Sequence, residues 1–168
     1  MNPAIFDKLI DDALFNRIVE NLQPGIELQG LHGLQHWRRV ARNANWIVEA
    51  SCNDLDEDVV YHFAYLHDSC REHDGRDRQH GARAAERVMD WWAKDYINLS
   101  QDQALLLATA CEVHSSIDKA INPTLAACLD ADRLDLGRCG IQLDPGRLSL
   151  PLSARYIKAA LQEATIRP

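Results

Sequence analysis

The sequence predicts an all-α fold, a single helical bundle of about six to eight helices. Apolar residues recur at steps of three and four along most of the chain, whereas no segment of useful length alternates with a period of two. Residues typical of helix starts precede several of these stretches. Because no internal repeat or low-complexity tract divides the 168 residues, we expect one domain over residues 1–168.

Each expected helix follows from its apolar spacing and its start signals. Asp54 and Ser100, each with a Glu or Gln three residues later, are typical of capping boxes. Asn122-Pro123 is typical of a helix start with proline in the first turn. Residues 138–149 are expected to be irregular. The helices are expected, in chain order, over about residues 3–22, 34–52, 54–68, 78–96, 100–116, 122–137 and 151–165.

Composition argues against several classes of protein. The formal net charge of -7 makes an extended nucleic-acid-binding surface unexpected. Apolar runs are short and interrupted by charges, so no transmembrane span is expected, and the first residues lack the basic and apolar regions of a signal peptide. Five cysteines without a C-x-x-C pair argue against a disulfide framework, and several resemble small core residues. We therefore expect a reduced, cytoplasmic protein.

A histidine and an aspartate end one apolar helical stretch. His67 and Asp68 directly follow residues 59–66, and at the inner end of a buried helix both side chains are able to turn toward one point. Neutral imidazole and carboxylate are groups that divalent metals take from proteins. The pair therefore indicates a metal site, and the alternative is a core histidine beside a solvated aspartate.

Three more polar residues, His36, His114 and Asp132, lie on otherwise apolar helical faces. The face of Asp132 carries more and larger apolar side chains than the face of Asp130, so we expect Asp132 to be the more buried of the two. A buried carboxylate requires a metal, an arginine or several hydrogen bonds. The same reasoning makes Asp132 a candidate ligand.

Three motifs occur in a fixed order along the chain. His32-Gly33-Leu34-Gln35-His36-Trp37-Arg38-Arg39-Val40 comes first, His67-Asp68 second and Ala131-Asp132-Arg133-Leu134 third. This ordered set, with helix-sized gaps, resembles the HD-domain superfamily of metal-dependent phosphohydrolases over about residues 30–137. The resemblance implies an HD-like core on which the expected helices 3–22 and 151–165 pack.

The resemblance also implies a ligand set. The first metal histidine of the family falls on His36, the histidine followed by Trp-Arg-Arg-Val, and not on His32. The paired ligands fall on His67 and Asp68, and the last one on Asp132. They imply one divalent ion, which we expect to be Mn, Fe, Co, Ni, Zn or Mg.

Some branches of the superfamily hold two ions and have two extra histidines. His80 and His114 lie at comparable positions here, which leaves a second ion open. The alternatives are an exposed first-turn residue for His80 and a core histidine bonded to a backbone carbonyl for His114. Of the flanking aspartates, Asp130 is expected to orient a ligand and Asp135 to face solvent.

The implied chemistry uses a water molecule activated by the metal. A carboxylate beside the metal, Asp68 or Glu72, is expected to take the proton of that water. One arginine binds two phosphate oxygens at once through two of its N–H groups. The candidate phosphate-binding arginines are Arg71, Arg133 and Arg39. The alternative for each arginine is a solvated surface charge.

The expected function is the hydrolysis of a nucleotide or another small phosphate ester. Two alternatives stay open. One is a di-iron oxygenase of the same fold, which would use His80 and His114 as additional ligands. The other is a non-catalytic ligand- or partner-binding domain, in which an exposed Trp91-Trp92 pair would form the interface of a homodimer.

Overall fold

The computed structural model describes residues 12–23, 26–52 and 54–164. Over these residues the chain is built from α-helices and short 3₁₀ turns, and no strand is present among them, which confirms the predicted all-α class. The elements are α1 (Asp12–Glu20), α2 (Leu34–Ala50), α3 (Glu57–Leu66), α4 (His80–Ala93), α5 (Gln101–Val113), α6 (Pro123–Arg133), η2 (Leu136–Cys139), η3 (Pro145–Arg147), η4 (Pro151–Tyr156) and α7 (Ile157–Ala164).

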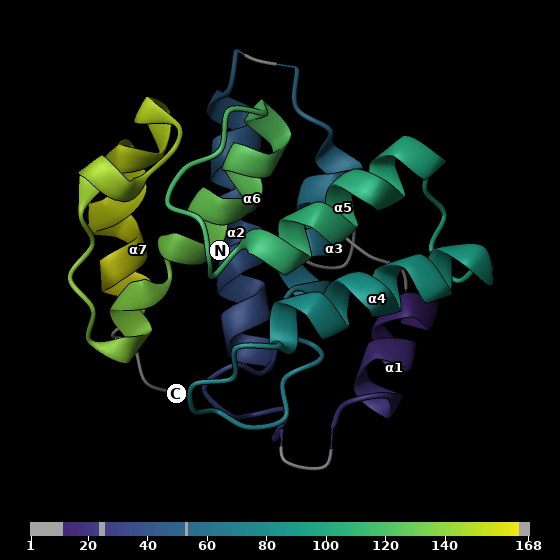
Figure 1. Ribbon diagram of the computed structural model, residues 1–168. Coiled ribbons are helices and arrows are strands. Elements are labelled where there is room, and N and C mark those ends of the chain that lie inside the picture. Colours follow the sequence, from purple (N-terminus) through teal and green to yellow (C-terminus); the bar gives the residue numbers. More distant parts are fainter. Residues whose placement is uncertain (1–11, 24–25, 53, 165–168) are drawn as a thin grey trace.

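Helices α2, α3 and α6 form the centre of the bundle (Figure 1). The antiparallel hairpin of α4 and α5 lies on one side of this centre, and α7 lies on the other side. Large apolar side chains from the central helices and α5 are fully buried: Trp37, Phe63, Leu66, Leu107 and Leu129. The core is therefore continuous from the central helices into the hairpin.

Two predicted helix starts are confirmed. Ser100 accepts the N–H of Gln103, whose side chain in turn accepts the N–H of Ser100, so α5 begins with a capping box. Asn122 accepts the N–H of Leu125 at the start of α6.

The start of α3 differs from the prediction. Asp56, and not Asp54, caps the helix by accepting the N–H of Val59. The backbone N–H of Asp56 donates to Thr124, and its carboxylate accepts a hydrogen bond from Gln103. Contacts with α6 and α5 therefore fix the start of α3, and no local pattern reports such contacts.

Other bounds differ by a few residues. Helix α4 begins at His80 because Asp77 turns the chain by accepting the N–H groups of Glu72 and Gln79. Residues 138–149 are irregular as predicted, apart from 3₁₀ turns at both ends of the segment. The expected last helix is 3₁₀ over η4 before it becomes α7. Residues 3–11 of the first expected helix lie outside the described residues.

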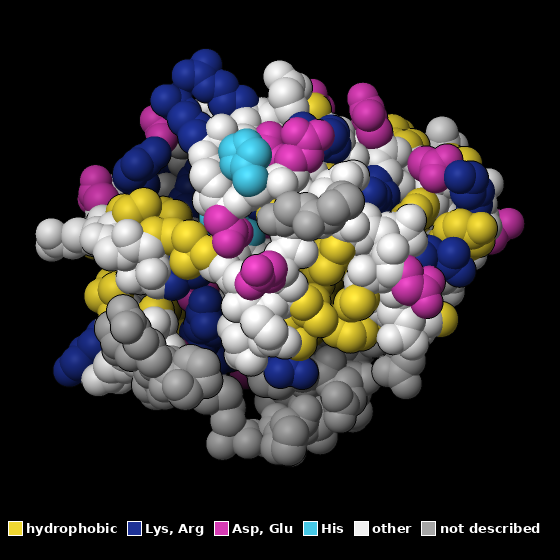
Figure 2. Space-filling view, turned by 90° about the horizontal axis from the view of Figure 1, so that it is seen from below, with side chains coloured by type: hydrophobic (Ala, Val, Ile, Leu, Met, Phe, Trp, Pro, Cys, Tyr) yellow, Lys and Arg dark blue, Asp and Glu magenta, His cyan; other side chains and the backbone are white. Residues whose placement is uncertain are grey.

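Three cysteines, Cys70, Cys111 and Cys128, are buried as predicted, whereas Cys52 and Cys139 are exposed. Across the described residues, no helix has both the length and the apolar character needed to cross a membrane. On the face seen in Figure 2, acidic and basic side chains are interspersed with apolar ones over much of the surface.

The expected exposed tryptophan pair is absent. Trp91 is buried in the core, and Trp92 is half-buried with its indole N–H donating to the carbonyl of Leu99 at 2.9 Å. The spacing of α4 places Trp91 against the bundle, and the turn before α5 covers part of Trp92. The expected exposure of the pair is therefore wrong, because only Trp92 keeps part of its surface open to solvent.

Gly81 allows α4 and α5 to approach closely at the end that carries His80. A Cβ atom at Gly81 would lie 2.6 Å from the carbonyl oxygen of Cys111 and 2.8 Å from that of Glu112. Gly81→Ala would force the two helices apart, so we expect it to lower the free energy of unfolding by about 1–3 kcal/mol. Urea denaturation followed by far-UV circular dichroism measures this change.

Gly75→Ala is the matched control, because a Cβ atom at Gly75 would meet only the His73 side chain, at 3.1 Å. We expect its unfolding midpoint to stay close to that of the unaltered chain. An equal loss in both variants would contradict the close-approach explanation.

Candidate metal centre

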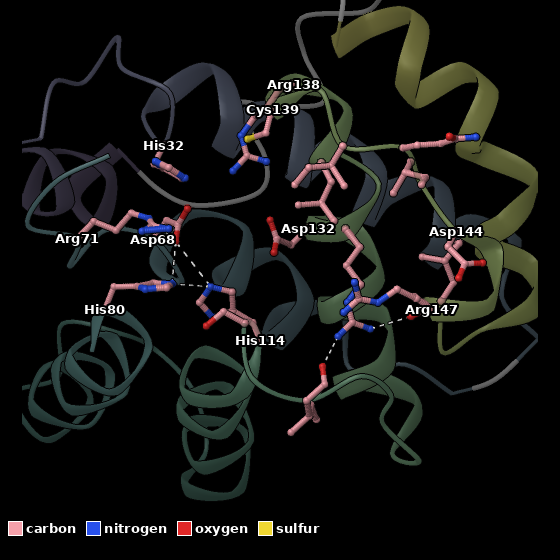
Figure 3. A pocket seen from close by; sticks show the side chains of 18 residues that line it. His32, Asp68, Arg71, His80, His114, Asp132, Arg138, Cys139, Asp144 and Arg147 are labelled. Atoms are coloured by element: carbon pink, nitrogen blue, oxygen red, sulfur yellow. Dashed lines mark hydrogen bonds and ion pairs between the residues drawn. The ribbon is translucent and has the colours of Figure 1, made fainter. Parts of the chain in front are cut away.

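Six side chains with metal-binding groups converge where five helices have their ends. His36 lies in the first turn of α2, His67 and Asp68 follow α3, His80 opens α4, His114 follows α5, and Asp132 lies near the end of α6. All are buried except Asp132, whose side chain is 15% exposed. Figure 3 shows Asp68, His80 and His114 grouped together, with Asp132 beside them facing the pocket. The structure thus brings together every ligand that the sequence predicts.

Three of the four histidines are oriented by a hydrogen bond from Nδ1 to a backbone carbonyl. Nδ1 of His67 lies 3.0 Å from the carbonyl oxygen of Phe63, and Nδ1 of His114 lies 2.7 Å from that of Cys111. Nδ1 of His80 binds the carbonyl oxygen of Asp77 in the same way. Because a carbonyl oxygen only accepts hydrogen bonds, each Nδ1 must carry a proton and donate it.

The Nε2 atoms of these histidines face one another in two pairs. His36 Nε2 lies 3.0 Å from His67 Nε2, and His80 Nε2 lies 2.9 Å from His114 Nε2. With Nδ1 as the donor, a neutral imidazole presents a lone pair at Nε2. Two lone pairs at this separation repel each other unless positive charge, a proton or a metal ion, lies between or beside them.

In each pair, the pKa of one histidine is lowered and the pKa of the other is raised. Burial lowers the pKa of His67 to about 3 and also lowers the pKa of His80. Burial acts in the same direction on His36 and His114, but neighbouring carboxylates outweigh it and raise both pKa values. Each pair thus holds one histidine that favours a positive charge and one that opposes it.

Asp68 lies between the two pairs. Its Oδ2 atom is 3.4 Å from His36 Nε2 and 3.7 Å from His67 Nε2. Its Oδ1 atom is 3.3 Å from His80 Nε2 and 3.6 Å from His114 Nε2, and it makes no hydrogen bond. Burial would raise the pKa of Asp68, but the surrounding histidines hold it well below its usual value. Asp68 is therefore an ionised carboxylate with one oxygen for each pair.

Asp132 completes the first group of ligands. Its Oδ1 atom lies 3.5 Å from His36 Nε2 and 3.7 Å from His67 Nε2. His36, His67 and Asp68 form one trio whose ligand atoms lie within 4.8 Å of one another, and Asp68, His80 and His114 form another. Imidazole and carboxylate donors in such groups suit a divalent metal ion, and the two trios share Asp68.

The prediction that Asp132 is more buried than Asp130 is wrong. Asp130 is fully buried, whereas Asp132 is partly exposed to the pocket. The carboxylate of Asp130 accepts the backbone N–H groups of Ser149 and Leu150, each at 2.8 Å, and does not orient a metal ligand. It holds the loop after η3 against α6.

Asp135 orients His36, and the prediction that it faces solvent is wrong. It is fully buried, and its Oδ2 atom accepts the Nδ1–H of His36 at 2.7 Å. Arg39 binds the same carboxylate with two nitrogens, at 2.6 and 3.2 Å, and Arg138 lies 3.4 Å away. Arg39 therefore supports a ligand and does not line the pocket as a phosphate-binding group.

Two more predicted site residues have other contacts. Arg133 lines the pocket, but its terminal nitrogens donate to the backbone carbonyls of Ile117, Asp118 and Arg147. The carboxylate of Glu72 is 59% exposed, faces Arg83 and lies outside the pocket. Arg133 therefore anchors the pocket wall, and Glu72 is not placed to act as a base.

Four of the six candidate ligands, Asp68, His80, His114 and Asp132, form the floor of a pocket of about 380 Å³, whereas the buried His36 and His67 do not line it (Figure 3). Arg71 lies beside Asp68, with its Nε atom 3.2 Å from Asp68 Oδ1. His32, which the sequence set aside, lines the rim and binds Asp74 at 2.8 Å. Arg138 also lines the pocket, and only its position after the third motif could have suggested this role.

No protein-family model, no curated protein and no solved structure matches this chain. The assignment of the centre therefore rests on its own donor groups. Four imidazoles and two carboxylates, with Nε2 atoms paired at 3.0 and 2.9 Å, define a candidate binding site for one or two divalent metal ions.

Asp135→Asn tests how His36 is held. The change removes the negative charge behind the imidazole, and carboxylates that orient metal-binding histidines contribute about 10–100-fold to metal affinity. We expect a loss of that size in the affinity for Mn or Zn, measured by competition with a chelator. Asp118→Asn, at a carboxylate that is 80% exposed, is the control and should leave metal affinity unchanged. Equal affinities in both variants would contradict the role of Asp135.

Proposed function

We propose that this chain is a metal-dependent phosphohydrolase of the HD-domain type that acts on a small phosphate ester, a class that includes nucleotides. The observation that carries the proposal is the convergence of four Nε2 atoms and two carboxylates beside one pocket, which Asp68, His80, His114 and Asp132 line. The three motifs that resemble the HD-domain superfamily supply the residues of the first metal group and the shared Asp68. Helices α4 and α5 add the second histidine pair.

The arrangement supports two ions. His36, His67 and Asp132 would hold one ion together with Oδ2 of Asp68, and His80 and His114 would hold the other together with Oδ1. When bound, divalent ions lower the pKa of a coordinated water and reduce the negative charge on a phosphate group. Oxygen and nitrogen donors in these numbers suit Mn, Fe, Co, Ni or Zn.

The chain's own residues supply binding and proton transfer. Arg71 and Arg138 lie on the pocket wall beside the floor, where their guanidinium groups bind the nonreacting phosphate oxygens. Water attacks phosphorus, the bond from phosphorus to the ester oxygen breaks, and phosphate and an alcohol are released. Asp132 is the metal-binding carboxylate most open to the pocket, so it takes the proton of the attacking water and returns it to the leaving oxygen.

A di-iron oxygenase is the second candidate. The presence of His80 and His114 in the same cluster favours it, because six ligands, one of them the shared Asp68, also suit two irons. Metal analysis separates the two: two irons per chain with an oxygen-dependent change in the absorption spectrum would support the oxygenase. Redox-inert ions with release of phosphate would support the hydrolase.

The double variant His67→Ala/Asp68→Ala tests the phosphohydrolase. It removes one histidine and the shared carboxylate, so we expect the Mn-loaded protein to lose phosphate release from a panel of nucleotides and simple phosphate esters by at least about a thousandfold. A phosphate assay measures this loss. His73→Ala, at an exposed loop histidine, is the matched control and should keep full activity. Activity that survives both the double variant and removal of metal by a chelator would sink the proposal.

A further inference from the structure

The pocket has a second half that the metal chemistry does not use. Beyond Asp132 its wall carries apolar side chains beside the polar Gln142, Asp144 and Arg147, and it comes from the segment between α6 and η4 together with the residues after α5. Figure 3 shows this half extending from Asp132 toward Asp144 and Arg147, away from the histidines. The apolar side chains that line it are Ile117, Leu136, Ile141, Leu143 and Leu148.

This wall is fixed by polar contacts from α6. Asp130 holds the N–H groups of Ser149 and Leu150, and Arg133 holds the carbonyls of Ile117 and Arg147. Leu143 and Leu148 are buried within the wall, whereas the side chain of Ile141 remains 48% exposed at the pocket. A preformed apolar surface next to a polar floor is typical of small-molecule sites.

The positive charges of the pocket suit one phosphate group. Four of the described lining residues are arginines and none is a lysine. Arg133 donates three hydrogen bonds to backbone carbonyls, and Arg147 lies at the far end, 63% exposed and paired with Asp118 at 2.9 Å. Arg71 and Arg138 are the two arginines near the floor, and Arg147 at the far end is already paired with Asp118, so the charges at the floor match a single phosphate group.

The volume of the pocket agrees with one phosphate subsite at the floor and one apolar subsite along the wall. A volume of about 380 Å³ is near the lower end of the range of about 300–1,000 Å³ for small-molecule pockets. It accommodates one phosphate at the floor and one ring-sized group against the wall.

We propose that the substrate is a phosphate monoester whose alcohol carries an apolar or aromatic ring, with the ring seated on Ile141, Leu143 and Leu148. This inference rests on the proposed function, because the metal ligands must hold the phosphate end. Ile141 determines specificity: its exposed side chain is covered only when the ring is bound. Leu143 and Leu148 supply the rest of the surface.

Two esters with similar leaving alcohols test the ring subsite. Benzyl phosphate and ethyl phosphate are both esters of primary alcohols, so their chemical reactivities are close and the ring is the main difference. For the Mn-loaded chain we expect kcat/KM for phosphate release to be about tenfold higher with benzyl phosphate, as the burial of apolar surface would give. The nonhydrolysable benzylphosphonate should likewise bind about tenfold tighter than ethylphosphonate by isothermal titration calorimetry.

Ile141→Asn links the preference to the wall. It should lower the benzyl-to-ethyl ratio of kcat/KM, and that of the phosphonate affinities, to about one-third or less of their values in the unaltered chain. The change in kcat/KM should come mainly from KM, because the variant removes exposed apolar surface without opening the core. Ile121→Asn makes the same change at a fully exposed isoleucine outside the pocket, and both ratios should stay as in the unaltered chain.

The outcomes separate this proposal from the proposed function. Hydrolysis of both esters with equal kcat/KM, and no effect of Ile141→Asn, would overturn the ring subsite and leave the hydrolase standing. Absence of hydrolysis with tighter binding of benzylphosphonate, lost in Ile141→Asn, would support the subsite and reject the hydrolase.

Discussion

The metal centre depends on the way that its histidines are fastened. Backbone carbonyls hold the Nδ1 atoms of His67, His80 and His114, and the carboxylate of Asp135 holds that of His36. This leaves four Nε2 atoms with lone pairs directed inward, in two pairs about 3 Å apart. Such an arrangement needs positive charge at its centre, from a proton or a metal ion, so the helix ends around it form a candidate cation site.

The segment from residue 130 to residue 135 contacts both the candidate metal ligands and the wall of the pocket. Asp130 and Arg133 fasten the apolar wall, Asp132 faces the metal ligands, and Asp135 orients His36. Four charged side chains thus turn in different directions from the end of α6. The change from an α-helix at Arg133 to a 3₁₀ turn at Leu136 makes this spread of directions geometrically available.

The transition from α-helix to 3₁₀ turn after Arg133 also marks the point where helical periodicity stops predicting which residues are buried. Helical periodicity placed His36, His67 and Asp132 on faces that do converge, because these residues lie within or directly after regular helices. Asp135 follows the end of α6, where a step of 100° per residue no longer applies, and its burial was missed for that reason. Asp130 was judged by its apolar neighbours, although its two backbone partners come from residues about twenty positions later.

The cluster also has a consequence for how the bundle holds together. His36 and His67 belong to the central helices, His80 and His114 belong to the α4–α5 hairpin, and Asp68 touches both. Ions bound there would act as a cross-link between two parts of the chain that are otherwise joined by apolar packing and a few hydrogen bonds, such as that from Gln103 to Asp56. Folding and metal loading are then linked, so scarcity of metal would weaken the attachment of the hairpin as well as the chemistry.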